Sequence, residues 1–333
     1  MAEFPVIEMT SLRSAALPSA TMALVELGNQ LRRANYHFVT PTPATIARVN
    51  ARPGNARARS LTDVFGWNRP FNPVLIPEAI LGAMRDAGVI EECASGLRST
   101  LRVSSLGGQL YFHSAFPTEA TDSVFFGPDT YRFARQLGAC VPALARRVTR
   151  CVDIGCGAGA GAIELARMCP SASVHAVDIN PAALTLTRVN ALLADTRSVL
   201  PEYSDLLANV DGTFDLIVAN PPYLVDEGAR AYRNGGGDLG AGLSLAIVNA
   251  AIGRLSPGGS LLLYTAAAIV DGVDALGAEV ARRLERAEMH WTYDEIDPDI
   301  FGEELDNPAY QAADRIAAVW LRATKPASHQ VYW

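Results

Sequence analysis

The chain has 333 residues, enough for a large core and two domains, and its formal net charge is −7. This acidic balance argues against a protein whose affinity comes mainly from neutralising phosphates, so nucleic acid is disfavoured as a partner. The proportions of 49% hydrophobic and 19% charged residues are those of a globular protein, and no apolar run is long enough to cross a membrane.

The start of the chain and the cysteines predict a cytoplasmic protein. Glu3 and Glu8 interrupt the basic, apolar and small-residue succession that a signal peptide would need. The five cysteines form no CxxC pair and have no histidine-rich segment nearby. We therefore expect reduced thiols and no metal site.

Residues 1–18 are predicted to be a tail, and residues 19–118 a smaller N-terminal helical domain. Thr42 is the expected N-cap of the second helix. Two alternating strands are expected around the turn at Gly107 and Gly108. Helices followed by a hairpin are typical of a winged-helix-like module, for which we expect a role as a substrate lid or scaffold. The expected helices are 21–35, 42–49 and 77–87.

Residues 119–148 are predicted to form a linker and an entry helix, which starts at Gly127-Pro128-Asp129-Thr130 with Asp129 or Thr130 as its N-cap. In residues 149–325, strand and helix patterns alternate. Such repeats predict an α/β domain with a mostly parallel sheet and helices on both faces. The expected strands are 151–154, 174–178, 214–219, 260–265, 290–293 and 314–321, and the expected helices are 160–168, 181–193, 243–255 and 273–285.

A glycine-rich loop follows the first strand of this α/β region. In "VDIGCGAGAGAIELA", Gly155, Gly157 and Gly159 lie between a strand and a helix. Glycines at such a place let the backbone approach a ligand closely, and the start of the helix offers free N–H groups. A tight turn with a purely structural role is the alternative explanation.

Acidic residues indicate the kind of ligand. Asp153 precedes the first glycine, where a carboxylate suits a cation better than a pyrophosphate. Asp178 ends the next strand, where it can accept both hydroxyls of a ribose. S-adenosyl-L-methionine has an amino group, a sulfonium and a ribose, and therefore matches both acids, whereas a nicotinamide dinucleotide matches only Asp178. Asp205 is a candidate acceptor for the adenine amino group, with a turn or helix cap as the alternative.

The segments "VDIGCGAG", "HAVDINPAAL" and "VANPPYL", in this order, resemble the motifs of class I S-adenosylmethionine-dependent methyltransferases over roughly residues 123–323. The Asn-Pro-Pro-Tyr motif is similar to that of the HemK/PrmC-like glutamine N5-methyltransferases and of amino-methylating DNA and RNA base methyltransferases. The resemblance implies a Rossmann-like domain with a mostly parallel seven-stranded sheet. The predicted cofactor site also includes Cys156, Ile179, Leu206 and Asn220.

The motif predicts how the reaction is assisted. A planar nitrogen in an amide, guanidine or aromatic amine attacks poorly because its lone pair is delocalised. The side-chain carbonyl of Asn220 and the backbone carbonyl of Pro221 can each accept one N–H and aim the lone pair at the methyl group. Pro221 and Pro222 keep the turn rigid, and Tyr223 can stack on the acceptor or steer it. We predict catalysis by positioning and by stabilising positive charge; a rigid loop without chemistry is the alternative.

Three acceptor classes stay open: a small amino-acid-like molecule, a protein side chain such as release-factor glutamine, and a nucleobase. Gly127 and Thr265 stand where the glutamine-methylating branch has an arginine and an acid, which points away from release-factor glutamine. An NAD-dependent oxidoreductase and a non-catalytic binding protein are the rival classes. The candidate residues of the acceptor site are Phe126, Thr130, Tyr131, Tyr223, Glu303 and Glu304. Packing between domains or a solvated loop is the alternative explanation for these residues.

Overall fold

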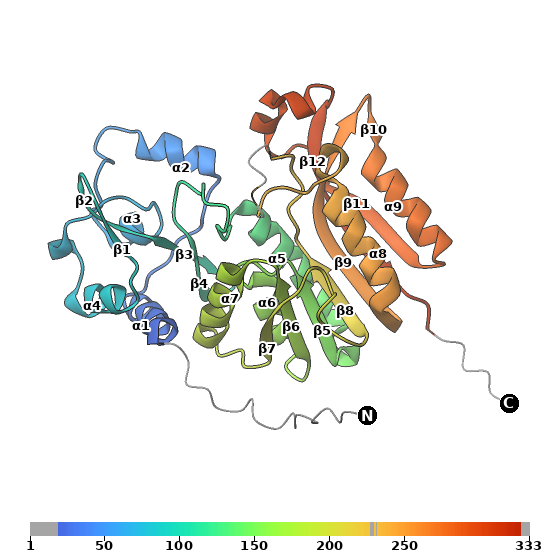
Figure 1. The fold of residues 1–333 in the computed structure, drawn as a ribbon, viewed down its shortest axis with the longest axis horizontal. Helices are drawn as coiled ribbons and strands as arrows, with labels where there is room; N and C mark the ends of the chain where they lie inside the picture. Colours follow the sequence, from blue (N-terminus) through green and yellow to red (C-terminus); the bar gives the residue numbers. More distant parts are fainter. Residues whose placement is uncertain (1–18, 227–229, 231, 328–333) are drawn as a thin grey trace, which may run out of the picture.

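The computed structural model describes residues 19–226, 230 and 232–327, so the predicted tail at 1–18 lies outside the described residues. The N-terminal helices and hairpins lie beside a larger region that is built around one sheet (Figure 1). Within the described ranges, no helix combines the length and apolarity needed to span a membrane.

The central sheet has the strand order β11-β12-β9-β8-β5-β6-β7, and the two-residue strand β10 pairs with β9. β5 to β9 run parallel, whereas β12 is antiparallel to both β9 and β11. The expectation of a mostly parallel seven-stranded sheet is confirmed, with β10 as a short addition. The strand bounds are Arg150–Ile154 (β5), Ser173–Asp178 (β6), Val199–Tyr203 (β7), Phe214–Ala219 (β8), Leu255–Val270 (β9), Val273–Asp274 (β10), His290–Asp297 (β11) and Arg315–Thr324 (β12).

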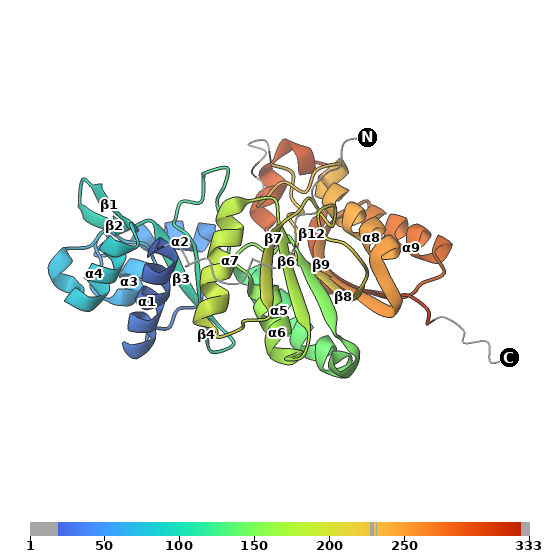
Figure 2. The same ribbon diagram turned by 60° about the horizontal axis from the view of Figure 1, so that its bottom comes forward.

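Helices cover both faces of this sheet (Figures 1 and 2). Side chains along β8 alternate, because Leu216 and Val218 pack in the core under α5, α6 and α7, whereas Ile217 and Ala219 pack under α8 and α9. With both faces covered, β8 is apolar on both sides apart from Asp215. The helices are Pro128–Cys140 (α5), Ala160–Met168 (α6), Pro181–Leu193 (α7), Gly242–Arg254 (α8) and Ala275–Arg286 (α9).

Among its described residues, the N-terminal region has four α-helices, a short 3₁₀ helix at Pro73–Leu75 and two hairpins. The Thr42 side chain caps α2 by accepting from the Thr45 N–H at 3.2 Å, as predicted. The predicted hairpin around Gly107 and Gly108 is β3–β4, but a second hairpin, β1–β2, follows α4 directly and was missed, as was α3. The bounds are Ser19–Arg33 (α1), Pro43–Asn50 (α2), Leu61–Phe65 (α3), Glu78–Asp86 (α4), Ile90–Cys93 (β1), Gly96–Ser99 (β2), Leu101–Leu106 (β3) and Gln109–Ser114 (β4).

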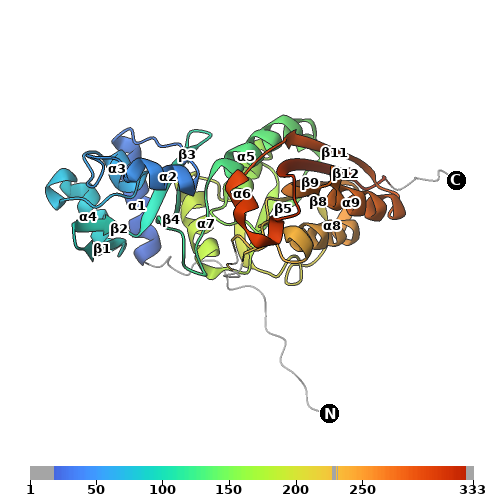
Figure 3. The ribbon, with the colours of Figure 1, turned by 90° about the horizontal axis from the view of Figure 1, so that it is seen from above.

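The β3–β4 hairpin joins the N-terminal region to α7 of the region built around the sheet. Viewed from above, β3, β4 and α7 lie between the N-terminal helices and the sheet (Figure 3). Asn190 of α7 is fully buried, accepts from the Phe112 N–H at 2.8 Å, and donates to the carbonyls of Phe112 and Ala158 at 3.0 and 2.8 Å. One side chain thus joins the hairpin, α7 and the glycine loop.

Replacing Asn190 with Ala is expected to lower the free energy of unfolding by about 2–3 kcal/mol, because three buried backbone groups would lose their partner. Urea unfolding monitored by circular dichroism measures this change. The exposed Asn209 offers the matched control, and Asn209→Ala should change stability little. Equal, small effects of the two substitutions would show that the Asn190 bonds do not hold the regions together.

The start of α5 differs from the prediction. Gly127 is its N-cap and Pro128 its first residue, because a proline fits the first turn of a helix, where no N–H is needed. The Thr130 hydroxyl accepts from the Gly127 N–H at 3.3 Å. Asp129 and Thr130 therefore lie inside the first turn instead of capping it, and Asp129 is only 3% exposed.

Candidate active site

A cavity of about 400 Å³ lies at the carboxyl ends of β5, β6 and β8. The sheet order reverses at β5, and such a switch point is the usual ligand site of an open α/β sheet. Most of the predicted site residues meet there: Phe126, Thr130, Asp153, Gly155, Cys156, Gly157, Asp178, Ile179, Asp205, Leu206, Asn220, Pro221, Pro222, Tyr223, Glu303 and Glu304.

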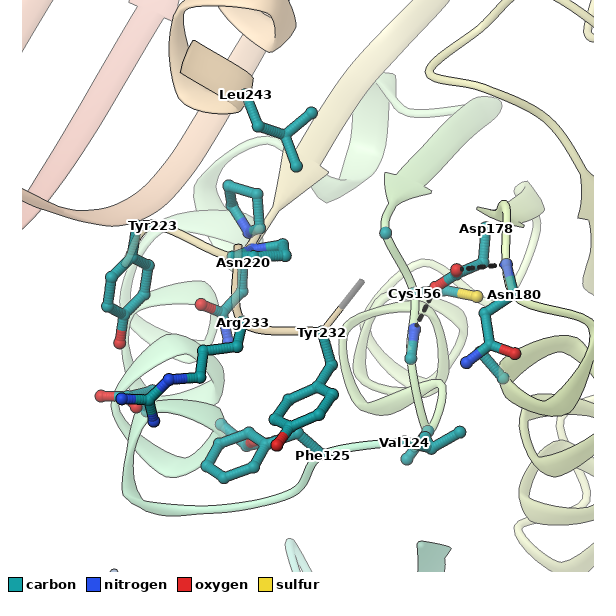
Figure 4. Close-up of a pocket in the computed structure, with 18 of the residues that line it drawn as sticks. Val124, Phe125, Cys156, Asp178, Asn180, Asn220, Tyr223, Tyr232, Arg233 and Leu243 are labelled. Atoms are coloured by element: carbon teal, nitrogen blue, oxygen red, sulfur yellow. Dashed lines mark hydrogen bonds between the residues drawn. The ribbon is translucent and has the colours of Figure 1, made fainter. Parts of the chain in front are cut away.

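The cavity has two sides. Figure 4 shows Cys156, Asp178 and Asn180 on one side, and Asn220, Tyr223 and Arg233 on the other. We call the first the glycine-loop side and the second the Asn-Pro-Pro-Tyr side. Segments far apart in the sequence therefore face each other across one space, as a site for two reacting molecules requires.

Two glycines shape the floor of the glycine-loop side. Gly155 and Gly157 have φ angles of 71° and 54°, which L-residues with side chains rarely adopt. A Cβ atom added to either would meet no protein atom within 4 Å, so the space beside them is open to a ligand. Glycine is therefore required at these two positions by the backbone conformation and not by close packing against other protein atoms.

Asp178 fixes the position of the same loop. Its carboxylate accepts from the N–H of Gly157 at 3.0 Å and from that of Asn180 at 2.9 Å. Burial raises the pKa of Asp178, while these backbone hydrogen bonds oppose that shift. Ile179 follows Asp178 in the sequence and is 49% exposed where it lines the cavity. A ligand bound in the cavity would cover this large apolar side chain.

The second acid, Asp153, is 2% exposed and accepts from the Ala162 N–H of α6 at 2.8 Å. Burial raises the pKa of Asp153 to about 7, the hydrogen bond from Ala162 opposes this rise, and the charge of Asp178 adds to it. A cation in the cavity would stabilise the ionised form of both carboxylates.

The Asn-Pro-Pro-Tyr turn begins where β8 ends at Ala219. Within the described residues the Asn220 side chain makes no hydrogen bond to the protein, although it lines the cavity, so its amide is available to a ligand. Pro221 is buried, and this rigid residue supplies no N–H that would compete for the carbonyl acceptors.

Tyr223 lies near an acid that the sequence analysis did not assign to the site. Burial and the charge of Asp129 raise the pKa of Tyr223 well above its ordinary value, so the phenol stays protonated. Asp129 accepts from the Tyr264 hydroxyl at 2.9 Å and from Arg132 at 3.3 Å. The rings of Tyr264 and Tyr223 pack with centroids 6.3 Å apart, so this buried cluster supports the tyrosine of the motif.

The glycine-rich segment after the motif packs directly on Tyr223. A Cβ atom at Gly235 would lie 2.7 Å from the Tyr223 Cα, and one at Gly240 would lie 2.2 Å from the Tyr223 carbonyl oxygen. Leu224 bonds to the same segment through its N–H and its carbonyl. Only glycines allow the chain to return this closely, so this stretch supports the motif.

Aromatic rings and one ion pair complete the Asn-Pro-Pro-Tyr side. The rings of Phe125 and Tyr232 are nearly parallel, with centroids 6.1 Å apart, and the Tyr232 hydroxyl donates to the Thr118 carbonyl at 2.6 Å. Arg233 donates through Nη2 to both carboxylate oxygens of Glu304 at 2.5 Å. The sequence analysis missed Tyr232 and Arg233, since no motif marks their positions.

Residues 137–270 match the family model described as "Methyltransferase small domain". The resemblance to class I methyltransferases is thereby confirmed. We refer to the sheet and its covering helices, which include the matched residues, from here on as the sheet region.

Three similar proteins show the range of likeness. A "Release factor glutamine methyltransferase" of Deinococcus radiodurans is 39% identical over 127 residues, which are 34% of this chain and 44% of that protein. A "4-amino-L-phenylalanine/4-methylamino-L-phenylalanine methyltransferase" of Streptomyces pristinaespiralis is 34% identical over 149 residues, 41% and 51% of the two chains. A solved structure, a putative transferase of Pyrococcus horikoshii, has 12% identity and a TM-score of 0.47, covering 71% of this chain and 77% of that one. The chain thus spans about half the length of the curated relatives it matches.

Two predicted residues do not line the cavity of the sheet region. Gly159 is the N-cap of α6, and a Cβ atom there would lie 2.9 Å from the Thr187 side chain, so this glycine serves helix packing. Tyr131 points away, because its hydroxyl accepts from the Thr40 N–H at 3.0 Å in the N-terminal region. This position of Tyr131 agrees with the alternative explanation, in which the side chain packs between domains.

The raised pKa of Asp153 predicts a pH dependence of stability. The folded chain keeps this proton up to about pH 7, whereas an unfolded aspartate releases it near pH ~4. Because the folded state binds more protons between these values, the contribution of Asp153 to the free energy of unfolding falls as pH rises through this window. Asp153→Asn removes this contribution, so the variant should gain stability relative to wild type between pH 5 and pH 8. Urea unfolding at four pH values checks this, and parallel curves would contradict the assignment.

Proposed function

We propose that this chain is an S-adenosyl-L-methionine-dependent N-methyltransferase that acts on a planar nitrogen, in an amide or a guanidine, of a small amino-acid-like molecule or a protein side chain. The observation that carries the proposal is the arrangement of one cavity, in which the Asn-Pro-Pro-Tyr turn faces an acidic glycine loop. We further propose a cytoplasmic location, because all five cysteines are free thiols.

The glycine-loop side fits the proposed cofactor. The open space at Gly155 and Gly157 accommodates a ligand against the backbone, and Asp178 has lone pairs left for ribose hydroxyls. Asp153 supplies negative charge for the cationic part of the cofactor. We assign the exposed Ile179 and the half-buried Leu206 to the faces of the adenine ring, and the exposed Asp205 to its amino group.

The bound cofactor supplies an electrophilic methyl group on a sulfonium. The chain then has to orient the nitrogen, for which Asn220 and Pro221 offer two carbonyl acceptors at the end of β8. Tyr223, packed beside Tyr264, limits where the flat acceptor can lie. Holding the nitrogen in this way both aims the lone pair and stabilises the positive charge that develops on it.

The names of these relatives support a nitrogen atom as the methyl acceptor and leave two classes of substrate open. One relative is named for glutamine in a release factor, and the other for the aromatic amine of a free amino acid. Both acceptors contain a nitrogen next to a delocalised system, which is the chemistry that the two carbonyls suit. A protein glutamine is therefore the alternative acceptor to a small amino-acid-like molecule.

We propose the division of the chain into residues 19–118, 119–148 and 149–325, with the first part as a lid or scaffold. Pro43 and Ala44 at the start of α2 line the cavity, so the N-terminal region reaches the proposed site. The segment before α5 contributes Phe125 and Phe126 to the same cavity. This placement supports a part in holding the acceptor.

The test is incubation of the full chain with methyl-labelled S-adenosyl-L-methionine and a panel of acceptors. The panel contains L-arginine, L-glutamine, 4-amino-L-phenylalanine, a glutamine-containing peptide and an oligonucleotide. Mass spectrometry of the products locates the methyl group. The proposal expects an N-methyl product from an amino acid or the peptide, whereas methylation of oxygen or carbon, or binding of NAD in place of the cofactor, would refute it.

A further inference from the structure

The Asn-Pro-Pro-Tyr side of the cavity contains one guanidinium. Among the described residues that line the whole cavity there are six carboxylates, and Arg233 is the one cationic side chain. A ligand with a carboxylate therefore has a single place at which an arginine can receive it. Figure 4 shows Arg233 on the same side as Asn220 and Tyr223 and away from Asp178.

Arg233 has unused hydrogen-bond donors. Its Nη2 donates to Glu304, and its Nε lies 3.3 Å from Asp226 without forming a hydrogen bond, although this nitrogen is buried. Within the described ranges Nη1 has no partner either. Because Nε is buried, the two N–H groups of Nη1 are the donors left for another group. Planar N–H groups of arginine match a carboxylate in geometry as well as in charge.

A second acid, Glu303, precedes the Glu304 that pairs with Arg233. Glu303 is exposed and lines the cavity, and it takes part in no ion pair with any described residue. Glu304 is already paired with Arg233, so Glu303 is the one of these two carboxylates left for a cation. Arg233 and Glu303 thus add one positive and one negative group to the lining of the same cavity.

We propose that these two residues bind the charged end of a free amino acid, with Arg233 holding the α-carboxylate and Glu303 the α-ammonium. This inference rests on the proposed function and narrows its acceptor. A residue inside a peptide has lost both charges, because its amino and carboxyl groups form amide bonds. The same two side chains therefore select a free amino acid over a protein side chain.

The rings beside Arg233 suit the rest of such a molecule. Phe125 and Tyr232 present nearly parallel faces, and Tyr223 lies with Phe301 at a centroid distance of 6.3 Å. Flat side chains that carry a delocalised nitrogen stack on aromatic faces. With its charged end at Arg233 and its flat end against one of these ring faces, the amino acid directs its side-chain nitrogen towards Asn220.

A purely structural role of Arg233 is the competing explanation, because the Arg233–Glu304 pair joins the segment after the motif to the turn at 302–306.

Calorimetry with protein saturated with S-adenosylhomocysteine separates ligand binding from a purely structural role. The probes are L-arginine, L-glutamine and 4-amino-L-phenylalanine, each compared with its α-carboxamide. We expect wild type to bind at least one free acid about tenfold or more tightly than its carboxamide, since the carboxamide cannot form the ion pair.

Three variants distinguish ligand binding by Arg233 from a purely structural role. Arg233→Gln should abolish the preference for the free acid and leave S-adenosylhomocysteine affinity unchanged. Glu304→Gln should keep or increase the preference, because it breaks the structural pair but frees the guanidinium. Arg230→Gln is the matched control, since Arg230 pairs with Asp226 in the same segment without lining the cavity, and it should change neither quantity.

The inference is overturned if wild type binds acid and carboxamide equally or binds none of the six probes. It is also overturned if Arg233→Gln and Glu304→Gln weaken all ligands alike, or if Arg233→Gln mainly weakens S-adenosylhomocysteine. Methylation of the glutamine peptide without binding of free amino acids would contradict this inference but would agree with the proposed function. Failure to bind S-adenosylhomocysteine at all would instead count against the proposed function.

Discussion

Asn220→Ala is expected to lower the single-turnover rate of methyl transfer by about 100-fold or more, with little change in the affinity for S-adenosylhomocysteine. The side-chain carbonyl at the end of β8 is one of two acceptors that aim the nitrogen, and a displacement of the reacting atom by about 1 Å already costs roughly this factor. Because Asn220 makes no hydrogen bond to other described residues, its loss should leave the fold intact. Rapid-quench kinetics and calorimetry measure the two quantities separately.

The control for this substitution is Asn249→Ala, which removes the same side chain from an exposed position on α8. This variant should match wild type in rate and affinity. Equal losses of rate and cofactor affinity in Asn220→Ala would show that Asn220 serves cofactor binding, and that the proposed orientation of the acceptor is wrong.

Asp178→Ala is expected to weaken binding of S-adenosylhomocysteine by about 1.5–3 kcal/mol, the range for charge-assisted hydrogen bonds. The carboxylate acts twice, since it is placed to accept ribose hydroxyls and it holds the Gly157 N–H that shapes the loop. Calorimetry at constant pH gives the change in affinity, and circular dichroism verifies that the variant is folded.

Asp205→Ala provides the comparison, because this acid lines the same cavity but is exposed to solvent. An exposed hydrogen bond contributes less, so a loss of only about 0.5–1 kcal/mol is expected. Unchanged affinity in Asp178→Ala would reject the ribose assignment, and a larger loss in Asp205→Ala than in Asp178→Ala would reverse the ranking of the two acids.

The sequence predicts the sheet region well because its signals are local. α6, α7 and β8 have the predicted bounds, since each combines a clear apolar period with glycine or proline at its ends. The site residues before and within the motif follow strand ends, and strand ends in a parallel sheet meet at one edge. Fold and cofactor side could therefore be predicted together.

The acceptor side was harder to predict, because its residues meet through tertiary contacts. Arg233 and Tyr232 come from an irregular segment whose position is set by glycines packing on Tyr223 and by bonds to Thr118 and Glu304. The role of Asp129 depends on burial behind Tyr223, which no periodicity reveals. In the N-terminal region, a short helix and a hairpin of low apolar content left no strong pattern.

The most direct test of the central claim is a crystal structure of the full chain with S-adenosylhomocysteine and the best acceptor from the panel. The account predicts that the cofactor sulfur faces Asn220 across a gap that holds the acceptor nitrogen, with N–H groups on the Asn220 and Pro221 carbonyls. A sulfur directed away from Asn220, or an acceptor bound outside the cavity, would contradict it.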